Sequence, residues 1–188
     1  MPTQPMCAMK QFIVKAARWL LSPWRHARQR RYAEAPAAAQ TMRELPNHQF
    51  LPVVAKAIAE GHTATIAVKG YSMRPFLEHM RDKVLLEPAP PDSLRVGDAV
   101  LAEIEPGHFV LHRIIGIADG EVTLMGDGNL RGTEHCSADK VCGRVRQYIR
   151  PNGHILQASD PRLRRQIKLW RRLLPIRRYL LFIYKATI

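Results

Sequence analysis

Residues 98–125 read DAVLAEIEPGHFVLHRIIGIADGEVTLM, and this stretch decides the fold class. It contains three runs rich in Val, Ile, Leu and Phe, at 98–105, 108–118 and 121–125, which is the composition of β-strands. Pro106-Gly107 and Asp119-Gly120 separate the runs. Asp-Gly is a preferred two-residue hairpin turn. The stretch therefore predicts consecutive, mostly antiparallel strands.

The same pattern extends to both sides of that stretch. Further strands are predicted at 63–69, 83–87 and 141–149. One helix is predicted at 47–60, where Asn47 is available as the N-cap and Gly61 closes the last turn. Its apolar face is expected to contain Phe50, Val53, Val54 and Ile58. We therefore expect a compact, mainly β domain with flanking amphipathic α-helices.

A serine at the end of the first predicted strand is the best candidate nucleophile. Ser72 lies in Gly70-Tyr71-Ser72-Met73-Arg74-Pro75, directly after an alternating run of apolar and polar residues. A lone serine in a turn usually only hydrogen-bonds its own backbone. Here a histidine follows in Val110-Leu111-His112-Arg113-Ile114. The pair matters because a serine hydroxyl needs a base to remove its proton, and an imidazole exchanges protons near neutral pH.

Five short boxes occur in a fixed order between residues 62 and 148. They are Gly70-Tyr71-Ser72-Met73-Arg74-Pro75, Arg81-Asp82-Lys83-Val84, Val96-Gly97-Asp98-Ala99-Val100, His112-Arg113-Ile114 and Gly126-Asp127-Gly128-Asn129. This order resembles the signal peptidase I and LexA-like serine peptidases. In the bacterial and LexA-like members the base is a lysine, whereas the endoplasmic reticulum and archaeal type uses a histidine. Because residues 109–117 contain no lysine, the resemblance implies a peptidase of the second type, with the β fold of that group, Ser72 as nucleophile and His112 as general base.

A third residue is needed to accept a hydrogen bond from the other histidine nitrogen. The family continues past Gly126-Asp127-Gly128-Asn129 to a supporting aspartate, and this chain departs from the pattern by reading Gly132-Thr133-Glu134-His135 there. Three acids are candidates. Asp127 lies in the box but could instead hold a turn, Glu134 is nearest to the missing aspartate, and Asp139 follows. We assign Ser72, His112 and Asp127 as the catalytic set, with Glu134 and Asp139 as alternatives.

Residues near these boxes have expected supporting roles. The backbone N–H of Ser72 is the simplest oxyanion donor, an interaction worth roughly 3 kcal/mol. Met73 and Phe76 either line a substrate cleft or belong to the core. Structural roles are expected for Asp82, Asp98 and Arg113.

The net charge of +13 is concentrated outside the part that carries the motifs. Residues 47–149 hold eleven Lys and Arg against thirteen acids, whereas 1–46 hold eight against two and 150–188 hold ten against one. We divide the chain into a basic N-terminal arm (1–46), a β domain with its leading helix (47–150) and a basic helical tail (151–188). Basic arms attract polyanionic surfaces. An anionic membrane is the expected partner, and nucleic acid is less favoured because aromatic residues do not alternate with the basic ones.

The tail predicts an amphipathic, arginine-rich helix. Ser159-Asp160-Pro161 supplies an N-cap and a proline at the first helical position. Pro175 breaks or kinks the helix. Its apolar positions are Leu163, Ile167, Trp170 and Leu174. Two outcomes remain open: the helix packs on the β domain with its arginines in water, or it binds anionic lipid.

No segment predicts a membrane span, a cofactor or a metal. Residues 9–23 form an amphipathic pattern that is too short and too charged to cross a bilayer and lacks the apolar run of a secretory signal; an organellar transit peptide ranks below a membrane-surface arm. We expect a cytoplasmic protein that can bind the membrane peripherally. The odd set of Cys7, Cys136 and Cys142 argues against a disulfide framework, and no four-ligand zinc set is visible.

The residues and the resemblance together predict a serine endopeptidase that cleaves a protein or peptide precursor. One alternative is a LexA-like regulator that cuts itself, although residues 1–46 are too short and too rich in Pro and Ala for a helix-turn-helix domain. Another is a non-catalytic descendant that binds a membrane or a partner, an alternative supported by the missing aspartate.

Overall fold

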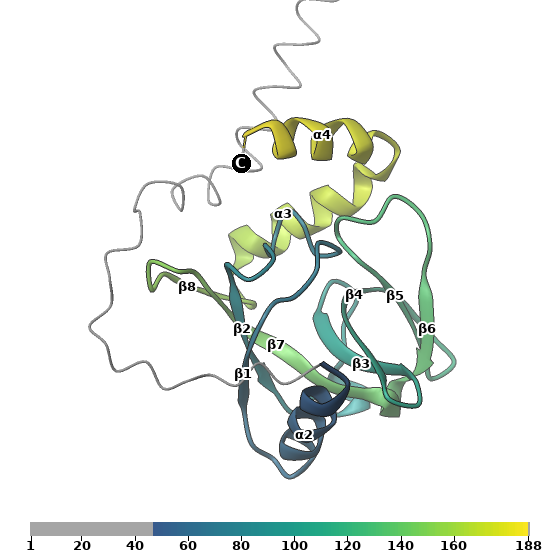
Figure 1. Cartoon of the computed structure of the whole chain (residues 1–188). Helices are drawn as coiled ribbons and strands as arrows, with labels where there is room; N and C mark the ends of the chain where they lie inside the picture. Colours follow the sequence, from purple (N-terminus) through teal and green to yellow (C-terminus); the bar gives the residue numbers. More distant parts are fainter. Residues whose placement is uncertain (1–46, 188) are drawn as a thin grey trace, which may run out of the picture.

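An antiparallel sheet of eight strands dominates residues 47–187, the part of the chain that the computed structural model describes (Figure 1). The predictions for 1–46, including segment 9–23 and Cys7, lie outside the described residues. The strand order is β1-β2-β7-β3-β4-β5-β6, and β8 pairs with β7. The strands are β1 Ala64–Ala67, β2 Lys83–Glu87, β3 Ala99–Glu105, β4 His108–Ala118, β5 Glu121–Met125, β6 Glu134–Ser137, β7 Val141–Ile149 and β8 Ile155–Gln157. The predicted mainly β class with flanking helices is confirmed.

The stretch 98–125 forms the meander β3-β4-β5, as predicted. Ala99 pairs with Arg113, and Arg113 pairs in turn with Met125 on the other side. The turn between β4 and β5 is Asp119-Gly120, with φ of 50° and 78°. Positive φ at both central residues is the geometry that favours Asp-Gly in two-residue hairpins. Local sequence therefore determines this part of the sheet.

Both faces of the central strand β3 are buried, each in a different core cluster. Ala99 and Leu101 belong to a cluster that also contains side chains from α2, α3 and α4. Val100 and Ala102 belong to a second cluster with β4, β5 and β6. Because successive side chains of a strand point to opposite faces, the sheet separates the two clusters. The candidate site combines β4, on which His112 pairs with Val100 of the second cluster, with the β1–β2 connection, which packs in the first cluster.

The helix α2 (Asn47–Ala59) covers one end of the first cluster and ends at Gly61, where φ is 91°. The prediction for its apolar face is right for Val54 and Ile58, which are buried, and wrong for Val53, whose exposed fraction is 65%. Val53 directly precedes Val54, so it points to a different side of the helix, and Leu51 packs against the core.

The helices α3 (Pro161–Arg172) and α4 (Arg177–Thr187) belong to the same core as the sheet. Asp160 caps α3 by accepting a hydrogen bond from the backbone N–H of Arg162, and Pro161 starts the helix, as predicted. The short 3₁₀-helix η4 (Leu174–Ile176), which contains Pro175, separates the two helices. Six of their side chains are buried in the first cluster: Leu163, Ile167, Trp170, Leu180, Leu181 and Tyr184. Figure 1 shows α3 across one end of the sheet and α4 outside it.

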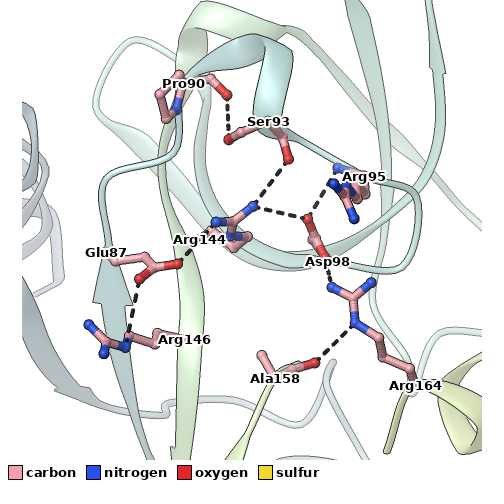
Figure 2. Close-up of polar contacts among 9 residues, drawn as sticks. All are labelled: Glu87, Pro90, Ser93, Arg95, Asp98, Arg144, Arg146, Ala158 and Arg164. Atoms are coloured by element: carbon pink, nitrogen blue, oxygen red, sulfur yellow. Dashed lines mark hydrogen bonds and ion pairs between the residues drawn. The ribbon is translucent and has the colours of Figure 1, made fainter. Parts of the chain in front are cut away.

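A polar network ties α3 to the sheet (Figure 2). Asp98, which is 7% exposed, accepts a hydrogen bond from the Arg95 backbone and forms ion pairs with Arg144 of β7 and Arg164 of α3. Arg144 also reaches Glu87 of β2, at 3.0 Å. The 3₁₀-helix η2 (Pro91–Ser93) joins the network because the Ser93 carbonyl accepts from Arg144. Asp98 therefore has the structural role expected of it.

Two strands were not predicted from the sequence. β6 contains polar residues and one buried side chain, Cys136, and β8 is only three residues long. An irregular segment precedes each of these strands. The 3₁₀-helix η3 (Ala138–Lys140) connects β6 to β7. Among the described residues, no helix has the length and apolar character needed to cross a bilayer.

Candidate active site

Ser72 lies half-buried in the connection between β1 and β2. The ends of this connection are joined by backbone hydrogen bonds, from Val68 N–H to Asp82 O at 2.9 Å and from Met80 N–H to Val68 O at 2.7 Å. Near its start Gly70 has φ of 95° and donates its N–H to Nδ1 of His79. A residue with a side chain would be strained at that φ. The loop is thus closed on itself, with Ser72 in its first half.

Buried side chains fix the same loop to the core. Met73, Phe76 and Leu77 are at most 2% exposed and belong to the first cluster. Of the two roles left open for Met73 and Phe76, the structure gives them the role of core residues. Asp82 at the end of the loop is fully buried and forms ion pairs with Arg81 and Arg150, as expected of a structural acid.

His112 lies on β4 and is paired with a carboxylate. Its Nδ1 is 2.7 Å from Oε2 of Glu134, and its side chain is 8% exposed, against 29% for Glu134. Leu124 of β5 pairs with both Ile114 and Glu134. Paired residues share a face, and so do residues two apart on a strand. His112, Ile114 and Glu134 therefore point to the same face, which brings the two polar groups together.

Asp127, which we assigned to support His112, has a different partner. Its carboxylate accepts hydrogen bonds from Arg113 Nε at 2.8 Å and Nη2 at 2.5 Å, and both side chains are buried. Burial is the largest single influence and lowers the pKa of Arg113, but the charges and hydrogen bonds of Asp127 and Tyr148 together outweigh burial and raise the pKa overall. Arg113 follows His112 on the strand, so it points to the opposite face. The geometry therefore favours Glu134 in place of Asp127.

Asp139, the third candidate acid, lies exposed in η3. A hydrogen bond from Ser137 is the main cause that lowers the pKa of its carboxyl group. Among the described residues, no contact joins it to His112.

Two glycines bring the backbone of Ser72 close to the strand of His112. The register Arg113–Met125, continued by one residue, puts Gly126 opposite His112. A Cβ on Gly126 would lie 2.5 Å from the Ser72 carbonyl oxygen, and the N–H of Gly128 donates to that oxygen at 2.6 Å. The box Gly126-Asp127-Gly128-Asn129 thus serves as the surface against which the serine loop packs.

The Ser72 hydroxyl and Nε2 of His112 form no hydrogen bond within the described residues. Within the described residues, neither the hydroxyl nor the N–H of Ser72 makes a hydrogen bond, and the one partner of His112 is Glu134 on Nδ1. Nε2 of His112 is therefore available to accept a proton, and the Ser72 N–H to stabilise an oxyanion. Catalytic hydrogen bonds are often long before substrate binds.

The C-terminal helices α3 and α4 support two loops of the site, the serine loop between β1 and β2 and the loop that follows β5. The sequence did not predict this support. Trp170 Nε1 donates to the Asp127 carbonyl at 2.8 Å, and Arg177 Nη1 donates to that of Asn129 at 2.9 Å. Tyr184 donates its hydroxyl to Glu78, which is paired with Arg74 in the serine loop. Burial is the largest cause that raises the pKa of the Tyr184 hydroxyl, and the charge of Glu78 is the second. The contacts link residues far apart in sequence, so no local pattern could have revealed them.

Metal-binding groups are not clustered in the described residues: none of their His, Cys, Asp and Glu side chains form a set of three. Cys136 and Cys142 are free thiols, and burial is the main cause that raises the pKa of each. His135, next to Glu134, contacts Thr123 and Thr133.

Comparison with known proteins gives no family for the chain: no family model matches it, and no curated protein matches it.

Proposed function

We propose that the protein is a serine endopeptidase of the signal peptidase type, which cleaves a protein or peptide precursor. The observation that carries the proposal is the 2.7 Å contact between His112 Nδ1 and Glu134 Oε2, made by a histidine whose strand packs beside the Ser72 loop. A buried histidine with one nitrogen held by a carboxylate and the other unbonded is oriented to act as a general base. The five motif boxes and their order support the same conclusion.

The proposed reaction is acyl transfer through a covalent intermediate. Nε2 of His112 removes the proton of the Ser72 hydroxyl as its oxygen attacks the scissile carbonyl carbon. The Ser72 N–H stabilises the resulting oxyanion. The imidazolium, steadied by Glu134, then protonates the leaving amine as the peptide C–N bond breaks. Water, activated by the same histidine, releases the acyl group from Ser72. General-base assistance of this kind contributes about 10²- to 10⁴-fold.

The proposed substrate is a dedicated precursor rather than the bulk of exported proteins. The resemblance implies a preference for small residues just before the cut, as in the peptidases that process secretory precursors. We infer a protein that works on the cytoplasmic side, at the periphery of a membrane; the basic C-terminal segment, with ten Lys and Arg against one acid, supports that location.

A non-catalytic binding protein is the second candidate. It is favoured by one observation, that Ser72 and His112 form no hydrogen bond with each other within the described residues. The two candidates differ in the reactivity of Ser72.

Labelling by a serine-reactive phosphonate or acylating probe, read out as intact mass, tests the proposal. Wild type is expected to gain the mass of one probe, and Ser72→Ala and His112→Ala are expected to gain none. The matched controls are Ser159→Ala, which removes an exposed serine, and His135→Ala, which removes an exposed histidine beside Glu134. Wild type that several probe classes leave unlabelled would refute the peptidase and favour the binding protein.

A further inference from the structure

The outer side of the C-terminal helices exposes a set of large apolar side chains, which we call the η4–α4 face. Its members are Leu174, Ile176, Tyr179 and Phe182, with exposed fractions of 40%, 42%, 60% and 74%. Single exposed apolar residues are ordinary on protein surfaces, but four within nine positions are not.

Packing of the domain does not account for the η4–α4 face. The opposite side of α4 supplies the buried residues Leu180, Leu181 and Tyr184 to the first core cluster. Tyr179 and Phe182 are one turn apart and point outward on the other side. The helix is therefore apolar on two sides, and within the described residues only one of these sides is buried.

Cations border the η4–α4 face, and acids are missing from it. Arg172, Arg178 and Lys185 are exposed, and the guanidinium carbon of Arg178 lies 5.4 Å from the centre of the Tyr179 ring. From Pro161 onward the sequence contains no Asp or Glu. Apolar and aromatic side chains next to Lys and Arg, without acids, form the pattern of helices that lie in the interface of an anionic bilayer.

The η4–α4 face adjoins one of the site loops. Arg177, the first residue of α4, donates to the carbonyl of Asn129 at 2.9 Å. The next residues of that loop are Leu130, 46% exposed, and Arg131, also exposed. They add a further apolar side chain and a further cation close to the helix. Figure 1 shows α4 at the same end of the molecule as the β5–β6 connection.

We propose that the η4–α4 face docks on an anionic lipid bilayer, with Tyr179 and Phe182 among the acyl chains and Arg172, Arg178 and Lys185 at the headgroups. Charge complementarity favours this partner over a second copy of the chain, because self-association would bring the same cations together. A nucleic acid would engage the cations but leave the apolar side chains in water. The inference rests on the membrane-peripheral location proposed above and assigns a surface to it, but it does not require Ser72 to be reactive.

A photo-cross-linker at a single position distinguishes this face from the basic residues 1–46. Benzoylphenylalanine replaces Phe182 in the full chain, or replaces Val53 on α2, which is 65% exposed and serves as the matched control. Each protein is irradiated with vesicles of phosphatidylglycerol and phosphatidylcholine, or of phosphatidylcholine alone. We expect lipid adducts at position 182 on anionic vesicles, at least about tenfold above position 53 and above neutral vesicles.

Three results would overturn the proposal: no lipid adduct at position 182, equal adducts at 182 and 53, or a cross-linked dimer in place of the lipid adduct. Adding Arg178→Glu and Lys185→Glu to the position-182 protein is expected to lower the adduct about tenfold or more, since each cation near an anionic surface contributes to binding. Repeating the experiment on Ser72→Ala separates the two proposals, because lipid adducts are expected there even though probe labelling is lost.

Discussion

Glu134 lies 2.7 Å from His112 although their strands, β6 and β4, do not pair with each other. The strand between them, β5, pairs with both and sets the register in which Leu124 lies opposite Ile114 and Glu134. The contact therefore depends on three strands at once. A carboxylate held in this position can fix the tautomer of the imidazole, with the proton on Nδ1 and Nε2 as the acceptor.

Replacing Glu134 by Gln is expected to slow probe labelling of Ser72 by on the order of 10²- to 10⁴-fold, because an amide cannot stabilise the imidazolium as a carboxylate does. The measurement is the rate of mass gain against probe concentration. Asp139→Asn is the matched control, since Asp139 is exposed and has no contact with His112. Unchanged labelling in Glu134→Gln, or equal loss in both variants, would argue against the assignment.

Replacing Asp127 by Asn is expected to lower the free energy of unfolding by about 3–5 kcal/mol, because the buried guanidinium of Arg113 loses its counter-charge. Urea denaturation measures this change. Asp92→Asn removes an exposed acid from η2 and is expected to change stability by less than about 0.5 kcal/mol. If Asp127→Asn kept full stability and lost only labelling, Asp127 would be a catalytic residue after all.

Adding one methyl group at Gly126 tests the packing of the serine loop. The new Cβ would lie 2.5 Å from the Ser72 carbonyl oxygen, so either the loop or β5 has to move. We expect Gly126→Ala to destabilise the domain by about 1–3 kcal/mol and to slow labelling of Ser72. At Gly116 a Cβ would lie 3.7 Å from Thr123, which is an ordinary contact. Gly116→Ala should therefore label like wild type, and equal behaviour of the two variants would contradict this account.

Tyr184 makes the stability of the domain sensitive to alkaline pH. Burial and the charge of Glu78 raise its pKa in the folded state above the ordinary value of about 10. Between these two pKa values the unfolded chain loses a proton that the folded chain keeps, so the free energy of unfolding falls as pH rises above about 10. Its stabilising effect is fully present below that pH.

Tyr184→Phe is the variant that isolates this effect. It removes the hydrogen bond to Glu78 and is expected to cost about 1.5–3 kcal/mol near neutral pH. The variant should also lose less stability than wild type between pH 9 and about 11, when both are measured by denaturant titration. The exposed Tyr179, changed to Phe, is the control. Parallel stability curves for wild type and Tyr184→Phe would contradict the pKa shift.

The sequence predicted the elements that short-range chemistry determines. The meander of 98–125 follows from apolar runs and Asp119-Gly120, and α3 begins where Asp160 and Pro161 mark its start. β6 escaped prediction because its four residues bury only Cys136, so it forms a strand through pairing with β5 rather than through its own composition. Val53 was misplaced because only the packing of α2 decides which side of that helix faces the sheet.

For the candidate site, the sequence pointed to single residues but did not determine which side chains they contact. The motif boxes selected Ser72 and His112, whereas the choice between Asp127 and Glu134 depended on which face each side chain takes across β4, β5 and β6. The support from Trp170 and Tyr184 joins residues 43 and 106 positions apart, and a local pattern contains no information on such contacts.

The contacts of α3 and α4 with the two site loops have a consequence during synthesis. The ribosome delivers the serine loop and the Gly126–Asn129 box long before Trp170 and Tyr184 leave the exit tunnel. Until then the first core cluster lacks the side chains that close it, and the carbonyls of Asp127 and Asn129 lack their donors. We therefore expect the nascent chain to hold Ser72 and His112 out of their final geometry, so that the proposed peptidase becomes competent only after translation has passed both residues by a wide margin.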